Sequence, residues 1–330
     1  MDNETLYAVY ESSDGNYIDT ITCNEKGEFF TSYELNDNIN AVTIYYNNRK
    51  QWFSVYPEVG KAVHVKGDAN YPQILQIKGG RTNNKLSEFK KKAVVLLKEQ
   101  TDIFDNKNEY SVSNREATAQ LANINIELKR IAQNFISKNT DEEASAILIS
   151  EYFSHPDEIE QTEEMLSLLS SDLDDYYIVK NLRTQINKAK ITMSGAMAPQ
   201  FNVTNIYGQT FNTDSLLNKN FILSFTASWC EMCQTDMMML SDIATDYSKD
   251  SIEILLISLD NNIPEIRDIL SKDSIKWNFV ADSAGQAINL FDTYNVNSLP
   301  NCFLIDKEGV IKLKTNNGLE LKQAVDEIMK

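Results

Sequence analysis

Histidine, cysteine and basic charge are all scarce in this 330-residue sequence, and each shortage argues against a class of protein. There are only two histidines and four cysteines, and only Cys230 and Cys233 have the close spacing of paired metal ligands, so a structural zinc ribbon is not expected. Cys23 and Cys302 lie far from that pair. A small fold held together by several disulfides is therefore not expected either.

The charge balance is 31 basic against 48 acidic residues, a net charge of −17. Nucleic acids and anionic membranes attract basic surfaces, so neither is an expected partner. No stretch approaches the roughly 20 apolar residues of a membrane span. The start, Met1 to Glu4, has neither the basic nor the apolar region of a signal peptide. The chain is therefore either cytoplasmic or a mature portion whose leader was removed.

Residues 1–86 are predicted to form an all-β, sandwich-like domain. Short runs rich in Tyr, Val, Ile and Thr are separated by glycine-containing turns about every 8–12 residues, a pattern typical of small sheets. The predicted strands are Leu6–Tyr10, Tyr17–Cys23, Glu28–Leu35, Val42–Tyr46, Gln51–Tyr56, Ala62–Lys66 and Gln73–Lys78.

Residues 87–190 are predicted to be a helical connecting segment. No glycine occurs between Arg81 and Ser194, and Pro156 is the only proline there. Apolar residues from Ala117 to Phe135 recur at steps of three and four, which is the stripe of an amphipathic helix. We expect two to four packed helices.

Residues 191–330 are predicted to form an α/β domain with helices on both faces of a sheet. The apolar runs Phe221–Thr226, Ile252–Leu259 and Cys302–Asp306 have strand length and read as strands buried on both faces. Segments of helical pattern separate them. The chain is thus predicted to contain several domains.

The stretch most informative about function is Trp229-Cys230-Glu231-Met232-Cys233, which follows a predicted strand and opens a predicted helix. Two cysteines at this spacing can cycle between dithiol and disulfide. Cys230 would lie over the free N–H groups of the helix start, where the helix dipole stabilises a thiolate. Cys233, shielded one turn later, would act as the resolving thiol that releases a mixed disulfide.

A second landmark is Leu299-Pro300, directly before the last predicted core strand. A proline in this position is a candidate for a cis peptide bond where the backbone approaches another group closely. Here that group would be the cysteine pair.

With these motifs, residues 195–330 resemble the thioredoxin fold, and specifically the TlpA/ResA-like thiol-disulfide oxidoreductases of the AhpC/TSA-type superfamily. The resemblance implies that Cys230 attacks and Cys233 resolves. It also implies that Trp229 and Leu299-Pro300 form the substrate-facing groove, and that Asp236 holds the place of an active-site Glu. A solvated acidic residue in the first helical turns is an equal alternative for Asp236.

Residues 1–86 resemble the domain-of-unknown-function 4369 family, which often precedes such modules in envelope lipoproteins. The C-terminal resemblance has departures. Ser224 stands where thioredoxins hold a buried Asp, and Met232 and Met238 replace two prolines. These departures concern proton handling and redox potential rather than the fold.

Glu231 lies beside Cys230, and a neighbouring anion disfavours a thiolate. We therefore expect a potential in the reducing half of the range between about −270 mV and about −120 mV.

Two functions from different classes remain. The first is a periplasmic or envelope thiol-disulfide oxidoreductase, acting as a reductase, that needs no metal or organic cofactor. Its partners would be disulfide-bearing client proteins and an upstream thiol donor, and a lipid anchor could lie on the missing leader. The alternative is a non-catalytic envelope binding or scaffold protein. An exposed cysteine pair favours the first, and a buried Cys230 favours the second. A peroxiredoxin ranks below both, because Ala227 occupies the position where that family has Thr or Ser.

Overall fold

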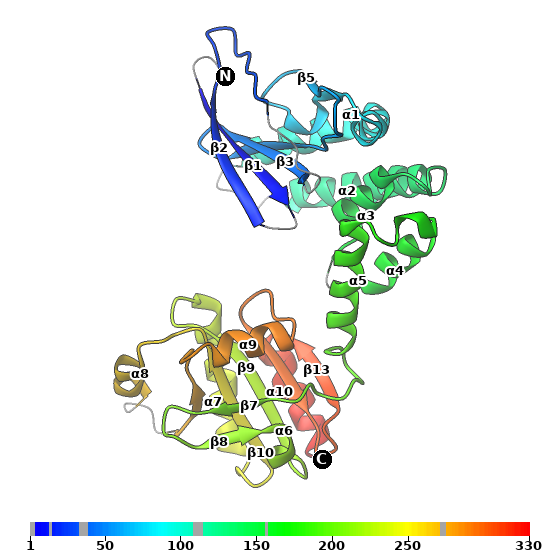
Figure 1. The fold of residues 1–330 in the computed structure, drawn as a ribbon. Helices are drawn as coiled ribbons and strands as arrows, with labels where there is room; N and C mark the ends of the chain where they lie inside the picture. Colours follow the sequence, from blue (N-terminus) through cyan, green and yellow to red (C-terminus); the bar gives the residue numbers. More distant parts are fainter. Residues whose placement is uncertain (1–3, 13–14, 33–38, 108–114, 156–157, 271–274) are drawn as a thin grey trace. The chain divides into compact units, whose positions relative to one another are not determined.

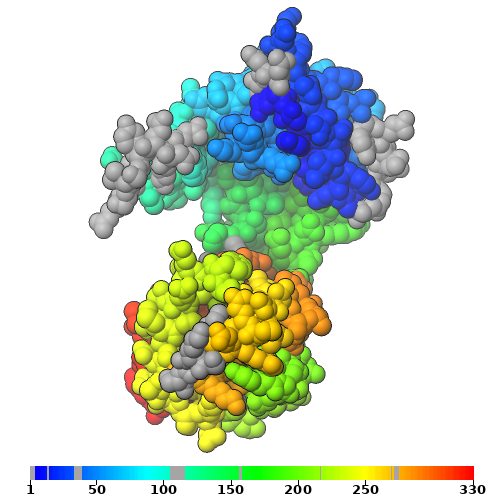
Figure 2. Space-filling model, turned by 90° about the vertical axis from the view of Figure 1, so that its left-hand side faces the viewer, coloured from blue at the N-terminus to red at the C-terminus, as the bar shows by residue number. Residues whose placement is uncertain are grey.

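The structure, a computed structural model, describes the whole chain except residues 1–3, 13–14, 33–38, 108–114, 156–157 and 271–274. Two units can be distinguished, Met1–Arg183 and Thr184–Lys330, each with its own hydrophobic core (Figure 1). Each unit by itself forms one continuous body of atoms (Figure 2). The finer boundaries predicted after residues 86 and 190 stay predictions.

The N-terminal unit opens with a four-stranded antiparallel sheet in the order β2-β1-β3-β4. Alternation along β1 buries Leu6, Ala8 and Tyr10 on one face. A shorter antiparallel pair, β5 and β6, adds to the same core through Ile77 in β6 and Leu75 directly before it. The strands are β1 (Thr5–Ser12), β2 (Gly15–Thr22), β3 (Ile39–Tyr46), β4 (Gln51–Val55), β5 (His64–Lys66) and β6 (Gln76–Lys78).

Three strand predictions in this unit are wrong in part. The predicted Ala62–Lys66 is a strand only from His64. Residues 28–32 form no strand, and the rest of the predicted Glu28–Leu35 lies outside the described residues. Asn24 and Glu28 hydrogen-bond each other through backbone and side chain, which closes a local turn in place of a ladder. The predicted Gln73–Lys78 is a strand only from Gln76, because Pro72 starts a short 3₁₀ turn at Pro72–Ile74.

Five α-helices follow within the described residues, where two to four were expected. One of them, α3, was hard to predict because it is buried on almost every side from Ala144 to Ile149 and therefore shows no amphipathic stripe. None of the described helices has the length and apolar composition to cross a membrane. The helices are α1 (Arg81–Lys107), α2 (Arg115–Ile136), α3 (Glu143–Tyr152), α4 (Ile159–Ser167) and α5 (Tyr177–Lys190).

The C-terminal unit is built on a five-stranded sheet in the order β11-β10-β9-β12-β13. Strands β9, β10 and β11 run parallel, whereas β12 is antiparallel to β9 and to β13. Of these strands, β9, β10 and β12 match the three predicted apolar runs, and nearly all their residues are buried. The strands are β9 (Asn220–Thr226), β10 (Ile252–Ser258), β11 (Asn278–Val280), β12 (Asn301–Ile305) and β13 (Ile311–Thr315).

Separate hydrophobic clusters cover the two faces of this sheet. One cluster includes residues of α9 and of the β7–β8 hairpin, and the other includes residues of α7, α8 and α10. This confirms the predicted arrangement of helices on both faces. The remaining elements are β7 (Asn202–Thr204), β8 (Thr210–Asn212), α6 (Thr213–Leu216), α7 (Glu231–Asp246), α8 (Ile263–Leu270), α9 (Gln286–Thr293) and α10 (Gly318–Ile328).

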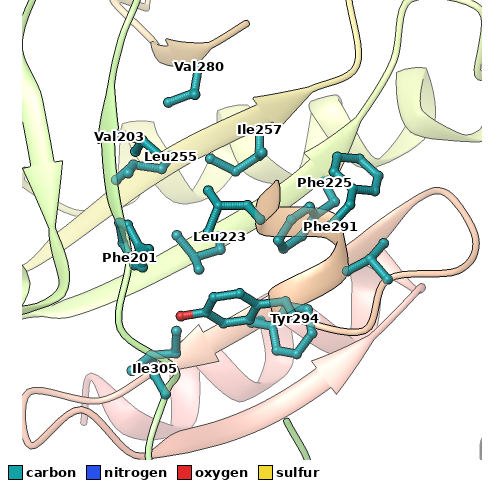
Figure 3. Packing of buried hydrophobic residues seen from close by; sticks show 14 of the residues in the cluster. Phe201, Val203, Leu223, Phe225, Leu255, Ile257, Val280, Phe291, Tyr294 and Ile305 are labelled. Atoms are coloured by element: carbon teal, nitrogen blue, oxygen red, sulfur yellow. The ribbon is translucent and has the colours of Figure 1, made fainter. Parts of the chain in front are cut away.

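Aromatic rings fill the centre of the α9-side cluster (Figure 3). The Phe225 ring meets Phe291 edge to face at 4.9 Å between centroids, and Phe303 at 5.7 Å. Tyr294 packs against the same rings, and its hydroxyl donates to the Pro199 carbonyl (2.9 Å). Phe225 lies in β9 two residues before Ala227, so this packing fixes the end of the strand that leads to the cysteine pair.

We expect Phe225→Ala to lower the free energy of unfolding of the C-terminal unit by about 3–5 kcal/mol, because it leaves a cavity among fully buried rings. Leu319→Ala, at a residue that is 58% exposed in α10, should cost less than about 0.5 kcal/mol. Denaturant unfolding followed by fluorescence of the buried Trp277 measures both. Equal losses in the two variants would contradict the packing argument.

Candidate functional site

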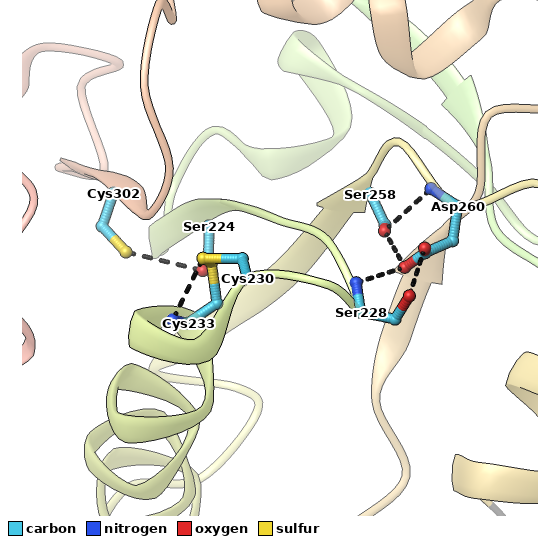
Figure 4. Close-up of a disulfide and its surroundings, with 7 residues drawn as sticks. All are labelled: Ser224, Ser228, Cys230, Cys233, Ser258, Asp260 and Cys302. Carbon is cyan, nitrogen blue, oxygen red and sulfur yellow. Dashed lines mark hydrogen bonds between the residues drawn. A yellow bond between two sulfur atoms is a disulfide. The ribbon is translucent and has the colours of Figure 1, made fainter.

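The cysteine pair lies where β9 turns into α7. Cys230 is the N-cap of the helix, with extended backbone, and its Sγ accepts a hydrogen bond from the backbone N–H of Cys233 (3.2 Å). The two cysteines form a disulfide, with 5.3 Å between their Cα atoms (Figure 4). This places the Cys230 sulfur at the positive end of the helix dipole, where a thiolate is favoured after reduction.

The Leu299–Pro300 peptide bond is cis, as predicted. Leu299 packs against Ala227, Cys230 and Cys233. The loop before β12 therefore lies directly against the disulfide, although some 70 residues of sequence separate them.

Cys230 is 7% exposed and Cys233 3% exposed. By exposure alone, the value for Cys230 meets the condition that favours a scaffold. However, Cys230 lines an open groove of about 870 Å³, whereas Cys233 does not. Of the two cysteines, only the first therefore borders the groove, in keeping with unequal roles for the two.

Trp229 and Glu231 flank Cys230 and also line the groove. The Trp229 side chain is 69% exposed, which is unusual for so large an apolar group. Leu299 forms part of the groove wall, so the structure brings these predicted residues together around Cys230.

Asp236 is not a solvated residue of the helix surface, because it is only 8% exposed. Its Oδ1 accepts the backbone N–H of Gly318 (3.1 Å), and its Oδ2 has no hydrogen-bond partner among the described residues. Burial raises the pKa of its carboxyl group, and the Gly318 hydrogen bond offsets this in part. A side chain on Gly318 would collide with Oδ1, so glycine permits this approach.

Ser224 and Cys302 lie side by side on β9 and β12, close to the disulfide (Figure 4). The Cys302 thiol donates to the Ser224 hydroxyl at 3.5 Å. Burial raises the pKa of Cys302 to about 12, so it stays a neutral thiol at physiological pH. Cys302 is therefore a core residue and not a reactive group.

Asp260 is a site residue that the sequence reasoning missed. Its carboxylate accepts the backbone N–H (2.9 Å) and the hydroxyl (2.7 Å) of Ser228, and the hydroxyl of Ser258 (2.7 Å) (Figure 4). The turn that carries Trp229 and Cys230 is thereby tied to the end of β10. The only signal in the sequence was a polar residue directly after a buried strand, which does not reveal its partner.

The comparisons with known proteins concern this same unit. Residues 194–314 match the model of the AhpC/TSA family. The thiol-disulfide oxidoreductase ResA of Bacillus thuringiensis is 27% identical over 136 residues, which are 41% of this chain and 76% of the relative. ResA of Geobacillus kaustophilus is 28% identical over 137 residues, 42% of this chain and 75% of the relative. The C-terminal unit is a thioredoxin-like oxidoreductase. These matches support a thiol-disulfide redox role and do not favour the scaffold alternative.

Solved structures also align with about two fifths of this chain. The thioredoxin domain of a thiol-disulfide oxidoreductase from Bacteroides vulgatus aligns with 42% of this chain and 99% of its own, at 20% identity and a TM-score of 0.39. A thiol-disulfide oxidoreductase from Bacteroides fragilis aligns with 40% and 98%, at 25% identity and a TM-score of 0.36. The resemblance of residues 1–86 to the 4369 family lies outside the family match and stays a prediction.

We expect Asp236→Asn to gain stability relative to the original chain as pH rises. The raised pKa means that the folded state favours the protonated carboxyl, so its contribution is fully present below the ordinary value of 3.8 and is lost as pH rises through the folded value. Asn keeps an acceptor for the Gly318 N–H. Denaturant unfolding of both proteins from acid to neutral pH measures the difference, and a difference independent of pH would contradict it.

Asp260→Ala should lower the free energy of unfolding by about 1–3 kcal/mol, because it leaves the buried Ser258 hydroxyl and the Ser228 N–H without their acceptor. It should also slow thiol exchange at Cys230. Asp250→Ala, at an exposed loop residue, is the matched control and should change neither. Unchanged rates of thiol exchange in Asp260→Ala would show that the hydrogen bonds to Asp260 do not position Cys230.

Proposed function

We propose that the protein exchanges disulfides of client proteins through Cys230 and Cys233, acting as a reductase. The single observation that supports this most directly is the disulfide at a helix N-terminus, of whose two cysteines only Cys230 lines a groove. The alternative, a binding scaffold with an inactive module, has the low exposure of Cys230 in its favour, but nothing else among the described residues supports it.

The reaction starts from the dithiol form. The Cys230 thiolate attacks one sulfur of the client disulfide, forms a mixed disulfide, and expels the other client sulfur as a thiolate that takes up a proton. The Cys233 thiolate then attacks the Cys230 sulfur and expels the second client sulfur. Two electrons pass to the client and the Cys230–Cys233 disulfide is formed. An upstream thiol donor restores the dithiol by the reverse exchange.

The neighbouring residues have supporting roles in this proposal. Trp229, Leu299 and Pro300 would hold the client segment against Cys230. Asp236, buried one helical turn beyond Cys233, would exchange a proton with the resolving thiol.

Glu231 bears on the redox potential. Its negative charge beside Cys230 opposes the helix dipole and disfavours the thiolate. The potential should therefore lie nearer the thioredoxin value of about −270 mV than the strongly oxidising value of about −120 mV.

The setting of the reaction is also part of the proposal. The proposed location is the periplasm or cell envelope, because residues 1–86 resemble a family that often precedes such modules in envelope lipoproteins. The client and the donor would be met there.

The test is a redox titration of the full chain, with thiol alkylation measured by mass spectrometry. We expect one reversible two-electron couple from Cys230 and Cys233, and its loss in Cys230→Ser. Cys233→Ser should accumulate a mixed disulfide with a client, because the resolving thiol is gone. Cys302→Ser, which removes a buried neutral thiol, is the matched control and should keep the couple. Absence of exchange at any potential would refute the proposal.

A further inference from the structure

The groove beside Cys230 has a wall that the motifs did not predict. Helix α9 contributes Ile288, Phe291 and Asp292 to the same groove that the Trp229–Met232 segment lines. The volume of about 870 Å³ lies within the range of ligand pockets, about 300–1,000 Å³. It takes a few side chains of a client, and not a whole folded surface.

Large apolar side chains line this groove and remain open to solvent. Trp229 is 69% exposed, Met232 65% and Ile288 51%. Apolar groups of this size, gathered around one reactive sulfur, are typical of a surface that binds another chain. A client side chain placed among them would gain roughly 25 cal/mol for each Å² of apolar surface removed from water.

The charged side chains that line the groove are all acidic. Glu231 and Asp292 line it, and none of the described lining residues is Lys, Arg or His. Asp292 already forms an ion pair with Lys188. The exposed carboxylate of Glu231, next to Cys230, has no ion-pair partner among the described residues. The unpaired negative charge therefore lies beside the reacting sulfur, where a basic side chain of a client would complement it.

We propose that this groove selects clients whose reacting cysteine is flanked by a large apolar and a basic side chain, presented on an extended, accessible segment. The inference rests on the proposed function and specifies its substrate class. The apolar preference comes from the Trp229, Met232 and Ile288 side chains. The basic preference comes from Glu231.

The test uses the reduced full chain and short peptides that each contain one cysteine in a mixed disulfide with thionitrobenzoate. The Cys230 thiolate attacks the peptide sulfur and expels coloured thionitrobenzoate, while the peptide stays bound to Cys230 until Cys233 releases it. Four peptides differ only beside the cysteine, with Leu or Gly on one side and Lys or Glu on the other. Stopped-flow absorbance gives the second-order rate constant for each.

We expect the Leu/Lys peptide to react at least about tenfold faster than the Gly/Glu peptide. Ile288→Ser should reduce the Leu-to-Gly rate ratio at least about threefold and leave the Lys-to-Glu ratio unchanged. Glu231→Gln should reduce the Lys-to-Glu rate ratio at least about threefold and leave the Leu-to-Gly ratio unchanged. Ratios between peptides cancel any change in the pKa of Cys230, because the same thiolate attacks all four peptides.

Met238→Ser is the matched control, since Met238 is 59% exposed on α7 but does not line the groove. Both rate ratios should stay as in the original chain.

In the original chain, the Lys-to-Glu rate ratio should also fall between about 0.01 M and about 1 M salt, because the Debye length shrinks from about 30 Å to about 3 Å.

Failure of this inference and failure of the proposed function give different results. Equal rates for all four peptides, with normal reduction of the symmetric thionitrobenzoate disulfide, would overturn the selectivity and leave the oxidoreductase intact. No reaction with either kind of disulfide would overturn the function itself. A dimer in solution that Ile288→Ser dissociates would show that a second copy occupies the groove, and would also overturn the inference.

Discussion

The arrangement of the site depends on the turn between β9 and α7 being held in place. Two hydrogen bonds from Ser228 to the Asp260 carboxylate hold this turn at the end of the neighbouring strand, and a third, from the Ser258 hydroxyl, orients the carboxylate. In β9, just before the turn, the Phe225 ring packs against the rings of Phe291 and Phe303. The hydrogen bonds of Asp260 and the aromatic packing of Phe225 together leave the two cysteines little freedom to move away from the N-terminus of α7.

The C-terminal fold could be predicted from the sequence because its central strands are buried on both faces. Strands in that position are predominantly apolar, so β9, β10 and β12 stand out as largely apolar runs even though Ser224 and Glu253 lie within them. The N-terminal strands are more exposed, as in β2, where only Ile21 is buried, and the ends of such strands depend on local turns such as that of Asn24. Their limits were accordingly predicted less well, and α3 was missed because helices buried all round have no stripe.

The site could be predicted only as far as its residues are close in sequence or mark a special backbone conformation. Cys230, Cys233 and Pro300 were identified in this way. Asp260 and the α9 wall were not, because their importance comes from long-range packing that no local pattern encodes. The sequence left Asp236 undecided between the place of an active-site Glu and a solvated residue. Its burial against Gly318, 82 residues away, excludes the solvated alternative.

Beneath the disulfide, the Cys302 thiol stays protonated and donates to Ser224. A neutral thiol is a poor nucleophile, so Cys302 cannot compete with Cys230 or Cys233 during turnover. The same holds for Cys23, which is buried in the other unit with its pKa raised by burial. Burial thus gives protection against disulfide shuffling: the chain can hold four cysteines, pass repeatedly through its dithiol state, and still reform only one pairing.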